Sequence, residues 1–332
     1  MSLKIKSKTK VLVGLRLSHF LQENKNYINP EPRISGSYKL NEDIALKTSF
    51  AMMNQYVHLL SNTGIGLPTD LWVPSTDNVA PQKSKQVALG VAKDFLNKNL
   101  ELTIEGYYKK SDDVIGYKEG ASFLMIGDPS GAESISWEEN ITTGKGWSYG
   151  VEVLLQRKIG KLSGWVGYTL SWTQLQFDEL NFGKKFWAKY DRRHDISLVG
   201  IYKLEENITI SGTWIYGTGN AISLPIAEYQ ANYHTLPQDV VDYWWDYVID
   251  YGEKNSFRMK AYHRLDFGIQ FHKKAERFKN GQKTYEINIY NAYSRKNPFY
   301  YFSDYDYEKD ENVIKQVSIF PIIPSFSYTL KF

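Results

Sequence analysis

Asp191 to Asp195 form a run of five consecutive charged or titratable side chains in this sequence of 332 residues. The stretch reads DRRHD, and its carboxylates and guanidinium groups can pair with one another or with a charged ligand. If Ile196 and Leu198 of the following segment face outward, Asp191, Arg193 and Asp195 all face inward. We therefore predict an inward-facing charge cluster of these three residues. A salt-bridge network that stiffens the chain is favoured over a role in ligand binding.

A second candidate is a run of aromatic residues between Glu228 and Asn255. Aromatic rings stack on sugars and on other flat ligands, so this run could bind a small ligand. An equally weighted alternative is that the rings pack on one another, with VVDYWWDYVIDY forming a short helix. Tyr56, His58 and Trp72 are weaker candidates of the same kind. The predicted ligand-binding residues are Trp72, Tyr229, Tyr233, Tyr243, Trp244 and Trp245.

Catalytic and metal-binding motifs do not occur in the sequence. Neither G-x-S-x-G nor H-E-x-x-H is present, and the six His are scattered without metal-ligand spacing. The stretch DYDYEKDEN resembles a Ca²⁺ loop, but Lys309 replaces the glycine that such a loop needs at its sixth position. A solvated acidic loop tip is therefore favoured. Because cysteine is absent, disulfides and zinc–thiolate sites are excluded. We expect no enzyme activity, no metal site and no cofactor.

The composition combines low hydropathy with many aromatic residues. Mean hydropathy is −0.44, and no stretch approaches the roughly 20 apolar residues of a membrane helix. Yet 15 % of the residues are aromatic. Both values fit a chain in which every second residue faces an apolar medium, as in an outer-membrane barrel. The net charge of +3, from 40 basic and 37 acidic residues, gives no reason to expect nucleic-acid binding.

Segments with a two-residue apolar period follow one another along the whole chain. In LELTIEGYYK, for example, Leu100, Leu102 and Ile104 share one face, and Glu101 and Thr103 lie opposite. No convincing amphipathic helix lies between the segments, so we predict an all-β protein of twelve strands. The segments lie at 11–20, 33–40, 44–52, 86–95, 100–109, 147–158, 162–172, 195–204, 208–217, 264–273, 284–293 and 320–332, and longer strands are expected at Leu100–Tyr117, Phe186–Leu204 and Val317–Phe332.

The connections between these segments alternate between short and long. The short ones are Asn41–Asp43, Asn97–Asn99, Ile159–Lys161, Glu205–Asn207 and the charged Lys273–Lys283. The long ones are Gln22–Pro30, Leu59–Gln82, Glu119–Thr143, Gln176–Lys185, Thr218–Asn255 and Ser294–Asn312. In an up-and-down barrel every second connection lies on the same rim, with tight periplasmic turns and long external loops. A Greek-key sandwich would not sort its loops in this way. The pattern predicts an antiparallel up-and-down transmembrane β-barrel.

The final segment, SFSYTLKF, keeps its alternation to the last residue, Phe332. An unpaired strand edge in hydrocarbon leaves unsatisfied backbone groups, so the closing strand of a barrel must stay regular. We expect Phe332 to lie on the lipid face at the periplasmic interface. This ending also resembles the C-terminal signature that outer-membrane proteins present to the barrel-assembly machinery. Pro321 and Pro324 should lie where lost ladder bonds face a loop or a bulge.

Three longer stretches resemble TonB-dependent receptors of Bacteroidetes-type bacteria: Met53–Val91, Tyr190–Pro225 and Asn291–Phe302, the last reading NAYSRKNPFYYF. The resemblance covers nearly the whole chain. It implies a ligand-gated importer with a plug domain inside a barrel of about 22 strands. External loops would capture a siderophore, a vitamin, or an oligo-glycan or peptide, and the TonB complex would supply energy. In that setting the charge cluster would face the barrel lumen, where it would meet the plug or the ligand.

Because about twelve strands are predicted, residues 1–332 are expected to be the C-terminal part of such a barrel domain, in the bacterial outer membrane. The plug, the TonB-contacting segment, the N-terminal strands and the signal peptide would then lie outside this sequence. The expected partners are membrane lipid, those missing parts, the TonB complex, the assembly machinery and a small nutrient. Two alternatives stay open. One is a complete twelve-stranded barrel, acting as a porin or hydrolase, with residues 11–19 paired to the last strand. The other is a soluble β-rich binding protein.

Overall fold

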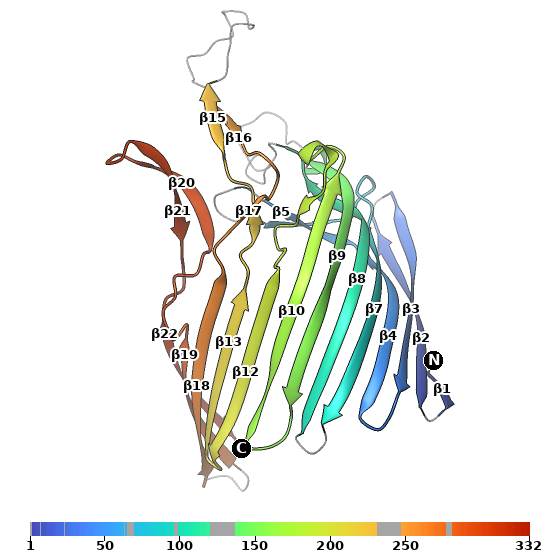
Figure 1. Ribbon diagram of the computed structural model, residues 1–332, viewed down its shortest axis with the longest axis vertical. Coiled ribbons are helices and arrows are strands. Elements are labelled where there is room, and N and C mark those ends of the chain that lie inside the picture. Colours follow the sequence, from blue (N-terminus) through green and yellow to red (C-terminus); the bar gives the residue numbers. More distant parts are fainter. Residues whose placement is uncertain are drawn as a thin grey trace, which may run out of the picture.

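A single large antiparallel sheet forms the wall of the molecule (Figure 1). The computed structural model describes residues 2–6, 8–22, 24–62, 64, 70–95, 99–119, 137–230, 247–276 and 281–332. Strands that are adjacent in the wall follow one another in chain order. They are β1 (Ser2–Lys6), β2 (Thr9–Leu21), β3 (Asn26–Lys39), β4 (Ile44–Gln55), β7 (Gln82–Phe95), β8 (Leu100–Tyr117), β9 (Ile141–Arg157), β10 (Leu162–Phe177), β12 (His194–Glu205), β13 (Ile208–Gly217), β18 (Tyr262–Ala275), β19 (Gly281–Tyr290) and β22 (Ile323–Lys331).

Smaller hairpins and two short 3₁₀ helices lie in the long connections at one end of the wall (Figure 1). The two-residue strand β11 (Phe186–Trp187) pairs with the end of β10. The hairpin partners are β5 (Val57–Ser61) with β6 (Asp70–Pro74), β14 (Ala221–Ile222) with β17 (Phe257–Arg258), β15 (Ala227–Gln230) with β16 (Tyr247–Asp250), and β20 (Tyr300–Asp306) with β21 (Glu311–Val317); the helices are η2 (Trp137–Asn140) and η3 (Asn181–Gly183). Among the described residues, no helix has the length and apolar character needed to cross a membrane.

The predicted all-β, antiparallel, up-and-down architecture is confirmed. Each of the twelve predicted segments overlaps a strand of the wall, and β8 and β13 have the predicted bounds. Tight turns lie at one end of the wall and the hairpins at the other, as the alternating connections predicted (Figure 1). The sheet curves like part of a barrel wall. Within the described ranges, no pairing joins β22 to β1 or β2, so the pairing that a closed twelve-stranded barrel requires does not occur.

Four sequence expectations about strands were wrong. The extra strand β1 was not predicted. The expected long link Gln22–Pro30 is a short turn, because β3 begins at Asn26. At Pro30 and Pro32, β3 pairs with β2 only, because its pairing with β4 begins at Arg33. A proline lacks a backbone N–H, and it is tolerated where one side of a strand has no ladder partner.

The other two errors concern continuous strands. The expected strand Phe186–Leu204 is broken between β11 and β12 by a turn in which the Asp191 backbone N–H donates to Ala188 O at 2.9 Å. The expected strand Val317–Phe332 is two strands, because β21 ends at Val317 and β22 begins at Ile323. Pro321 lies in the gap, and Pro324 lies in β22, whose pairing is with β19 alone.

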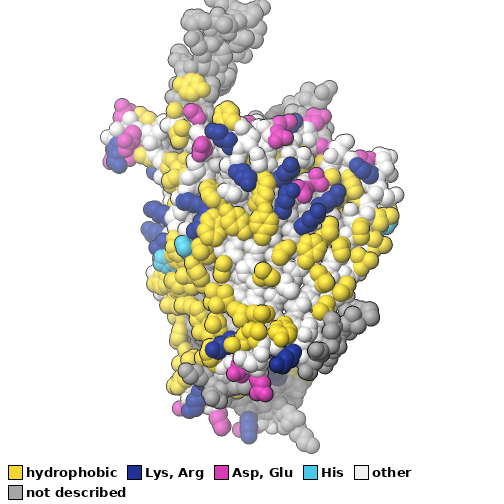
Figure 2. All heavy atoms as spheres, turned by 45° about the vertical axis from the view of Figure 1, so that its right-hand side comes forward, with side chains coloured by type: hydrophobic (Ala, Val, Ile, Leu, Met, Phe, Trp, Pro, Cys, Tyr) yellow, Lys and Arg dark blue, Asp and Glu magenta, His cyan; other side chains and the backbone are white. Residues whose placement is uncertain are grey.

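The two faces of the wall differ in chemistry. The residues of β2 that alternate outward remain exposed and apolar, as Leu15 (72 %) and Leu17 (67 %) illustrate. Figure 2 shows the same character over the outer surface, where hydrophobic side chains form a broad band. Fully buried apolar residues lie mainly at the hairpin end, where one cluster includes Leu60, Val73 and Ile115. The outer face therefore fits contact with lipid, and the packed core lies in the external layer.

Candidate functional site

A cavity of about 940 Å³ lies among the external connections. Four parts of the chain line it: residues 59–62 and 64 around the end of β5, residues 114–119 at the end of β8, residues 175–190 between β10 and β12, and residues 223–229 and 250–255 between β14 and β17. We call this cavity the vestibule. Its lining mixes charged side chains with aromatic rings, which are Tyr117, Phe177, Phe182, Phe186, Tyr190, Tyr229 and Tyr251. Such a mixture suits non-covalent binding of a small amphiphilic ligand.

An apolar cluster of Phe177, Leu180 and Phe186 forms part of the vestibule wall. The rings of Phe177 and Phe186 stack with centroids 5.9 Å apart. Phe177 reaches this position because β9 has a glycine beneath it. A Cβ on Gly144 would lie 2.3 Å from Gln176 O and 2.5 Å from the Phe177 ring. The close approach of β9 to the end of β10 thus depends on this glycine.

Asp70, at the start of β6, bonds the segment between β10 and β12 that lines the vestibule. Its carboxylate accepts from Lys189 Nζ at 3.0 Å and from the Tyr190 hydroxyl. Burial raises the pKa of Asp70, but these hydrogen bonds outweigh it and hold the pKa below its ordinary value. Burial and the bond to Asp70 raise the pKa of Tyr190 to about 12. Both groups therefore stay in their hydrogen-bonded forms at neutral pH.

Asp191 is the centre of a buried cluster, which we call the Asp191 cluster. It accepts from Thr173 N at 2.5 Å, from Arg193 Nη2 at 3.3 Å and from Arg258 Nη2. Arg258 also donates to the Asp191 backbone oxygen. The central carbon of the Arg193 guanidinium lies 4.6 Å from the centre of the Trp187 ring and 4.8 Å from the centre of the Trp172 ring. The cluster fixes the segment between β11 and β12 against β10 and β17.

The predicted charge cluster is thus only partly assembled. Asp191 and Arg193 pair, but Asp195 lies apart on β12, opposite Thr169. Its carboxylate is 3.5 Å from Arg192, and both side chains are substantially exposed. The sequence analysis missed Arg258 and Asp70. No local signal could have found them, because their partners lie at least 67 residues away in the chain.

The predicted ligand-binding residues and the weaker candidates lie in different parts of the structure. Tyr229 lies on β15, is 55 % exposed and lines the vestibule. Trp72 on β6 is exposed but does not line it. His58 is buried, with Nε2 3.0 Å from Ser75 Oγ, and Tyr56 bonds Ser18 within the wall. The predictions for Tyr233, Tyr243, Trp244 and Trp245 fall outside the described residues.

Two further predictions concern short stretches of the chain. The expected helix in VVDYWWDYVIDY is wrong over its described part, because Tyr247–Asp250 is the strand β16. The acidic stretch at 304–312 forms the turn of β20 and β21, where Asp304 pairs with Lys315 and Asp306 with Lys309. Within the described ranges, no group of three or more His, Asp or Glu is arranged to hold a metal ion. Phe332 follows β22 and is 90 % exposed.

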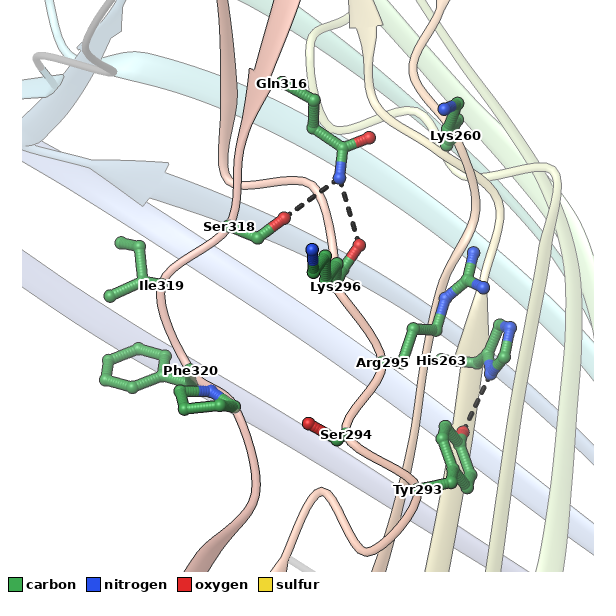
Figure 3. Close-up of a pocket in the computed structure, with 11 residues that line it drawn as sticks. Lys260, His263, Tyr293, Ser294, Arg295, Lys296, Gln316, Ser318, Ile319 and Phe320 are labelled. Carbon is green, nitrogen blue, oxygen red and sulfur yellow. Dashed lines mark hydrogen bonds between the residues drawn. The ribbon is translucent and has the colours of Figure 1, made fainter.

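A second cavity, of about 1000 Å³, lies between the connection after β19 and the segment before β22 (Figure 3). Its lining holds no acidic side chain but includes Lys260, Arg295 and Lys296. His263 and Tyr293 form one side and bond each other at 2.8 Å. These cations give the cavity a positive field that suits an anionic group. We call it the basic pocket.

Two asparagines of the NAYSRKNPFYYF stretch bond residues that line the basic pocket. Asn291 is fully buried, and its side-chain amide donates to Arg295 O at 3.0 Å and to Phe320 O at 2.9 Å. Asn297 pairs with the backbone of His263, accepting from its N–H at 3.0 Å and donating to its carbonyl at 2.9 Å. Asn291 thus bonds across the gap where β19 and β22 separate, and Asn297 fixes its segment to β18. These two asparagines therefore have a structural role.

The chain was compared with known proteins. Residues 1–308 match the family described as TonB dependent receptor-like, beta-barrel. No curated protein matches the sequence. Among solved structures, the ferric yersiniabactin uptake receptor of Yersinia pestis has a TM-score of 0.58 and 13 % identity, over 100 % of this chain and 44 % of that one.

Two other structures are similar to the same degree. The ferripyoverdine receptor of the outer membrane of Pseudomonas aeruginosa has a TM-score of 0.57 and 13 % identity, over 98 % of this chain and 37 % of that one. The ferric-catecholate import receptor of Escherichia coli K12 has a TM-score of 0.54 and 13 % identity, over 99 % and 42 %. The chain thus spans about two fifths of the length of these structures.

Proposed function

This chain belongs to the TonB-dependent receptor-like β-barrel family of outer-membrane proteins, and on that premise we propose that it forms the C-terminal strands and part of the external vestibule of a nutrient importer. The vestibule carries the proposal, because four external segments converge on a cavity of about 940 Å³ lined by aromatic rings. A cavity of this size suits a small nutrient. Binding there would be external and non-covalent, and no catalytic step is proposed.

The open edges of the sheet support the view that further strands complete the barrel. Within the described ranges, β22 pairs only with β19, and β1 pairs only with β2. Open edges in hydrocarbon leave backbone groups unsatisfied, so edge strands in a membrane need partners. We propose that those partners, a plug domain and the TonB-contacting segment belong to the same receptor. The stretches Tyr190–Pro225 and Asn291–Phe302 favour a Bacteroidetes-type receptor.

A ferric siderophore is the ligand class that we place first, ahead of a vitamin, an oligo-glycan or a peptide. Receptors of similar fold are named for ferripyoverdine, ferric yersiniabactin and ferric catecholate. The exposed rings of Tyr229 and Tyr251 offer faces on which a flat chelate can stack. The basic pocket adds positive charge in the same external layer, which favours anionic chelates.

The test is uptake of radiolabelled ferric chelates by cells that carry the complete receptor. Replacing Tyr229 and Tyr251 together by Ala should weaken binding of the transported chelate by about tenfold or more, since each stacked ring contributes on the order of 1 kcal/mol. Tyr307→Ala is the matched control, because Tyr307 is 88 % exposed and does not line the vestibule. Dissipating the proton gradient should abolish uptake and leave surface binding intact.

Two results would contradict the proposal. If the control variant loses binding to the same extent, the vestibule is not the binding site. If uptake persists without a proton gradient, the protein acts as a passive pore, as in the porin alternative.

A further inference from the structure

The outer face of the wall changes from apolar to basic along β7, β8 and β9. Cross-strand register identifies the residues that share this face: Val87 lies opposite Tyr108, and Tyr108 lies opposite Tyr149. Val87 and Tyr108 are 45 % and 50 % exposed, as expected of side chains in the lipid-facing band. Two residues further toward the hairpin end, the same alternation places Lys85 opposite Lys110.

Five lysines occupy this part of the outer face. Lys83 and Lys145 both lie opposite Asp112, from its two sides, and Lys110 lies opposite Trp147. The ammonium group of a fifth, Lys185, lies 4.0 Å from the centre of the Trp147 ring. We call Lys83, Lys85, Lys110, Lys145 and Lys185 the lysine belt. Figure 2 shows basic side chains in a row above the apolar band of the outer face.

The positive charge of the lysine belt is only partly neutralised by acidic residues of the same face. Asp112 is the acidic residue of this register, and its carboxylate is 3.5 Å from Lys110 Nζ. Directly opposed like charges, as in the pair of Lys85 and Lys110, destabilise a sheet. Four of the five side chains are exposed, and Lys110 is about half exposed. The arrangement therefore suits an external anion that approaches the outer face.

The height of the lysine belt indicates which anion this is. Immediately below it, Tyr108, Tyr149 and Trp172 stack with ring centroids 6.4 and 5.5 Å apart. Rows of aromatic residues mark the boundary between hydrocarbon and head groups in membrane barrels. The long hairpins lie on the same side, which makes this the external boundary. The lysines thus lie at the level of the head groups of the outer leaflet.

We propose that the lysine belt binds the phosphorylated head group of a lipid in the outer leaflet, with the acyl chains lying on the apolar face below. Lysine ammonium groups bind phosphate as compact point charges. The Trp147 ring, held beside Lys185, packs against the upper part of the lipid. This site lies on the outside of the wall, so it is separate from the vestibule and does not depend on the identity of the imported nutrient.

The experiment uses the complete receptor, reconstituted in nanodiscs. One set contains phosphatidylcholine alone, and the other contains phosphatidylcholine with a minor fraction of phosphatidic acid, whose head group is a phosphate monoester. Quenching of tryptophan by a brominated form of each lipid reports which lipid lies at Trp147. The variant carries Lys85→Gln, Lys110→Gln and Lys145→Gln. The control variant carries Lys161→Gln, Lys203→Gln and Lys274→Gln, three exposed lysines at the tight-turn end.

Wild type and control should enrich phosphatidic acid over phosphatidylcholine, and the belt variant should lose this preference by about tenfold or more. Trp147→Phe should remove most of the preferential quenching, which assigns the signal to this site. Equal enrichment in both triple variants would overturn the proposal. So would full competition by inorganic phosphate at concentrations that leave the membrane intact, because the site would then bind a free anion and not a lipid. Unchanged heat-modifiable gel mobility would show that the belt variant is folded.

Discussion

Two buried carboxylates, Glu31 in the wall and Asp191 in the external layer, have similar burial but different surroundings. They are 2 % and 1 % exposed. Glu31 accepts from Ser18 Oγ at 3.1 Å and from Asn54 N at 3.3 Å, so its partners lie on β2 and β4, which adjoin its own strand. Asp191 instead binds residues of β10 and β17. Glu31 therefore links strands that the ladder already joins, whereas Asp191 also links the segment between β11 and β12 to β17, with which that segment shares no ladder.

The arginines around the two carboxylates differ as well. Arg16 and Arg33 near Glu31 are 66 % and 48 % exposed, so water can solvate them if the carboxylate is lost. Arg193 and Arg258 are only 21 % and 29 % exposed. Removing a partner from a buried charge leaves an uncompensated charge, which is the most expensive outcome for an ion pair. The external layer should therefore depend more strongly on Asp191 than the wall depends on Glu31.

The largest effect is expected for Asp191→Ala. It leaves two partly buried guanidinium groups and the Thr173 N–H without their acceptor. We expect a loss of about 3–5 kcal/mol in the free energy of unfolding, measured by urea denaturation in detergent. Asp195→Ala is the control, since its pair with Arg192 is exposed and should contribute less than about 1 kcal/mol. Equal losses in the two variants would refute the central role of Asp191.

Asn291 offers a neutral test of the same comparison. Like the bond between Asp191 and Arg258, its bonds lie outside the strand ladders, because its side chain bonds Arg295 and Phe320 beyond the last pair of β19 and β22, Tyr290 and Ile323. Asn291→Ala should destabilise the protein by about 2–3 kcal/mol, since buried polar groups lose their partners. The temperature at which the folded band disappears from a gel measures this effect. Asn312→Ala, at an exposed position of the strand β21, should leave that temperature unchanged.

Glu31→Gln should have a smaller effect. The amide keeps the shape of the carboxylate and can still accept from Ser18 and Asn54, while the exposed arginines remain solvated. We expect a loss of about 1–2 kcal/mol in the same urea experiment. A loss as large as that of Asp191→Ala would show that adjacency in the sheet does not protect a buried carboxylate.

The same distinction separates what the sequence could predict from what it could not. The bounds of β13 follow from an uninterrupted two-residue period, which is a local property, and the start of β8 follows from the same period between Leu100 and Tyr108. The break between β11 and β12 could not be predicted, because it depends on the bonds of Asp191 to Thr173 and Arg258. Pro30 was misleading, because its tolerance in β3 depends on where pairing with β4 begins.

The vestibule was still harder to predict. Tyr229 could be recognised as an exposed aromatic residue in a long loop, but Asp70 gave no such signal. Its partners Lys189 and Tyr190 lie 119 and 120 residues further along the chain. Such bonds are properties of the folded external layer, and hydrophobic periodicity carries no information about them.

The bond between Tyr190 and Asp70 should give the smallest effect, and its pH dependence identifies it. The pKa of Tyr190 is raised from 10.0 to about 12, because burial and the hydrogen bond to Asp70 favour the neutral phenol. A raised pKa means that the stabilisation is complete below about pH 10 and is lost as pH rises through about 12.

Tyr190→Phe removes one hydrogen bond of a half-exposed side chain, so it should cost about 0.5–1 kcal/mol at neutral pH. The difference in melting temperature between wild type and Tyr190→Phe should shrink between about pH 10 and about pH 12, and other tyrosines cancel in that difference. A difference that stays constant over this range would mean that the phenol of Tyr190 does not bind Asp70.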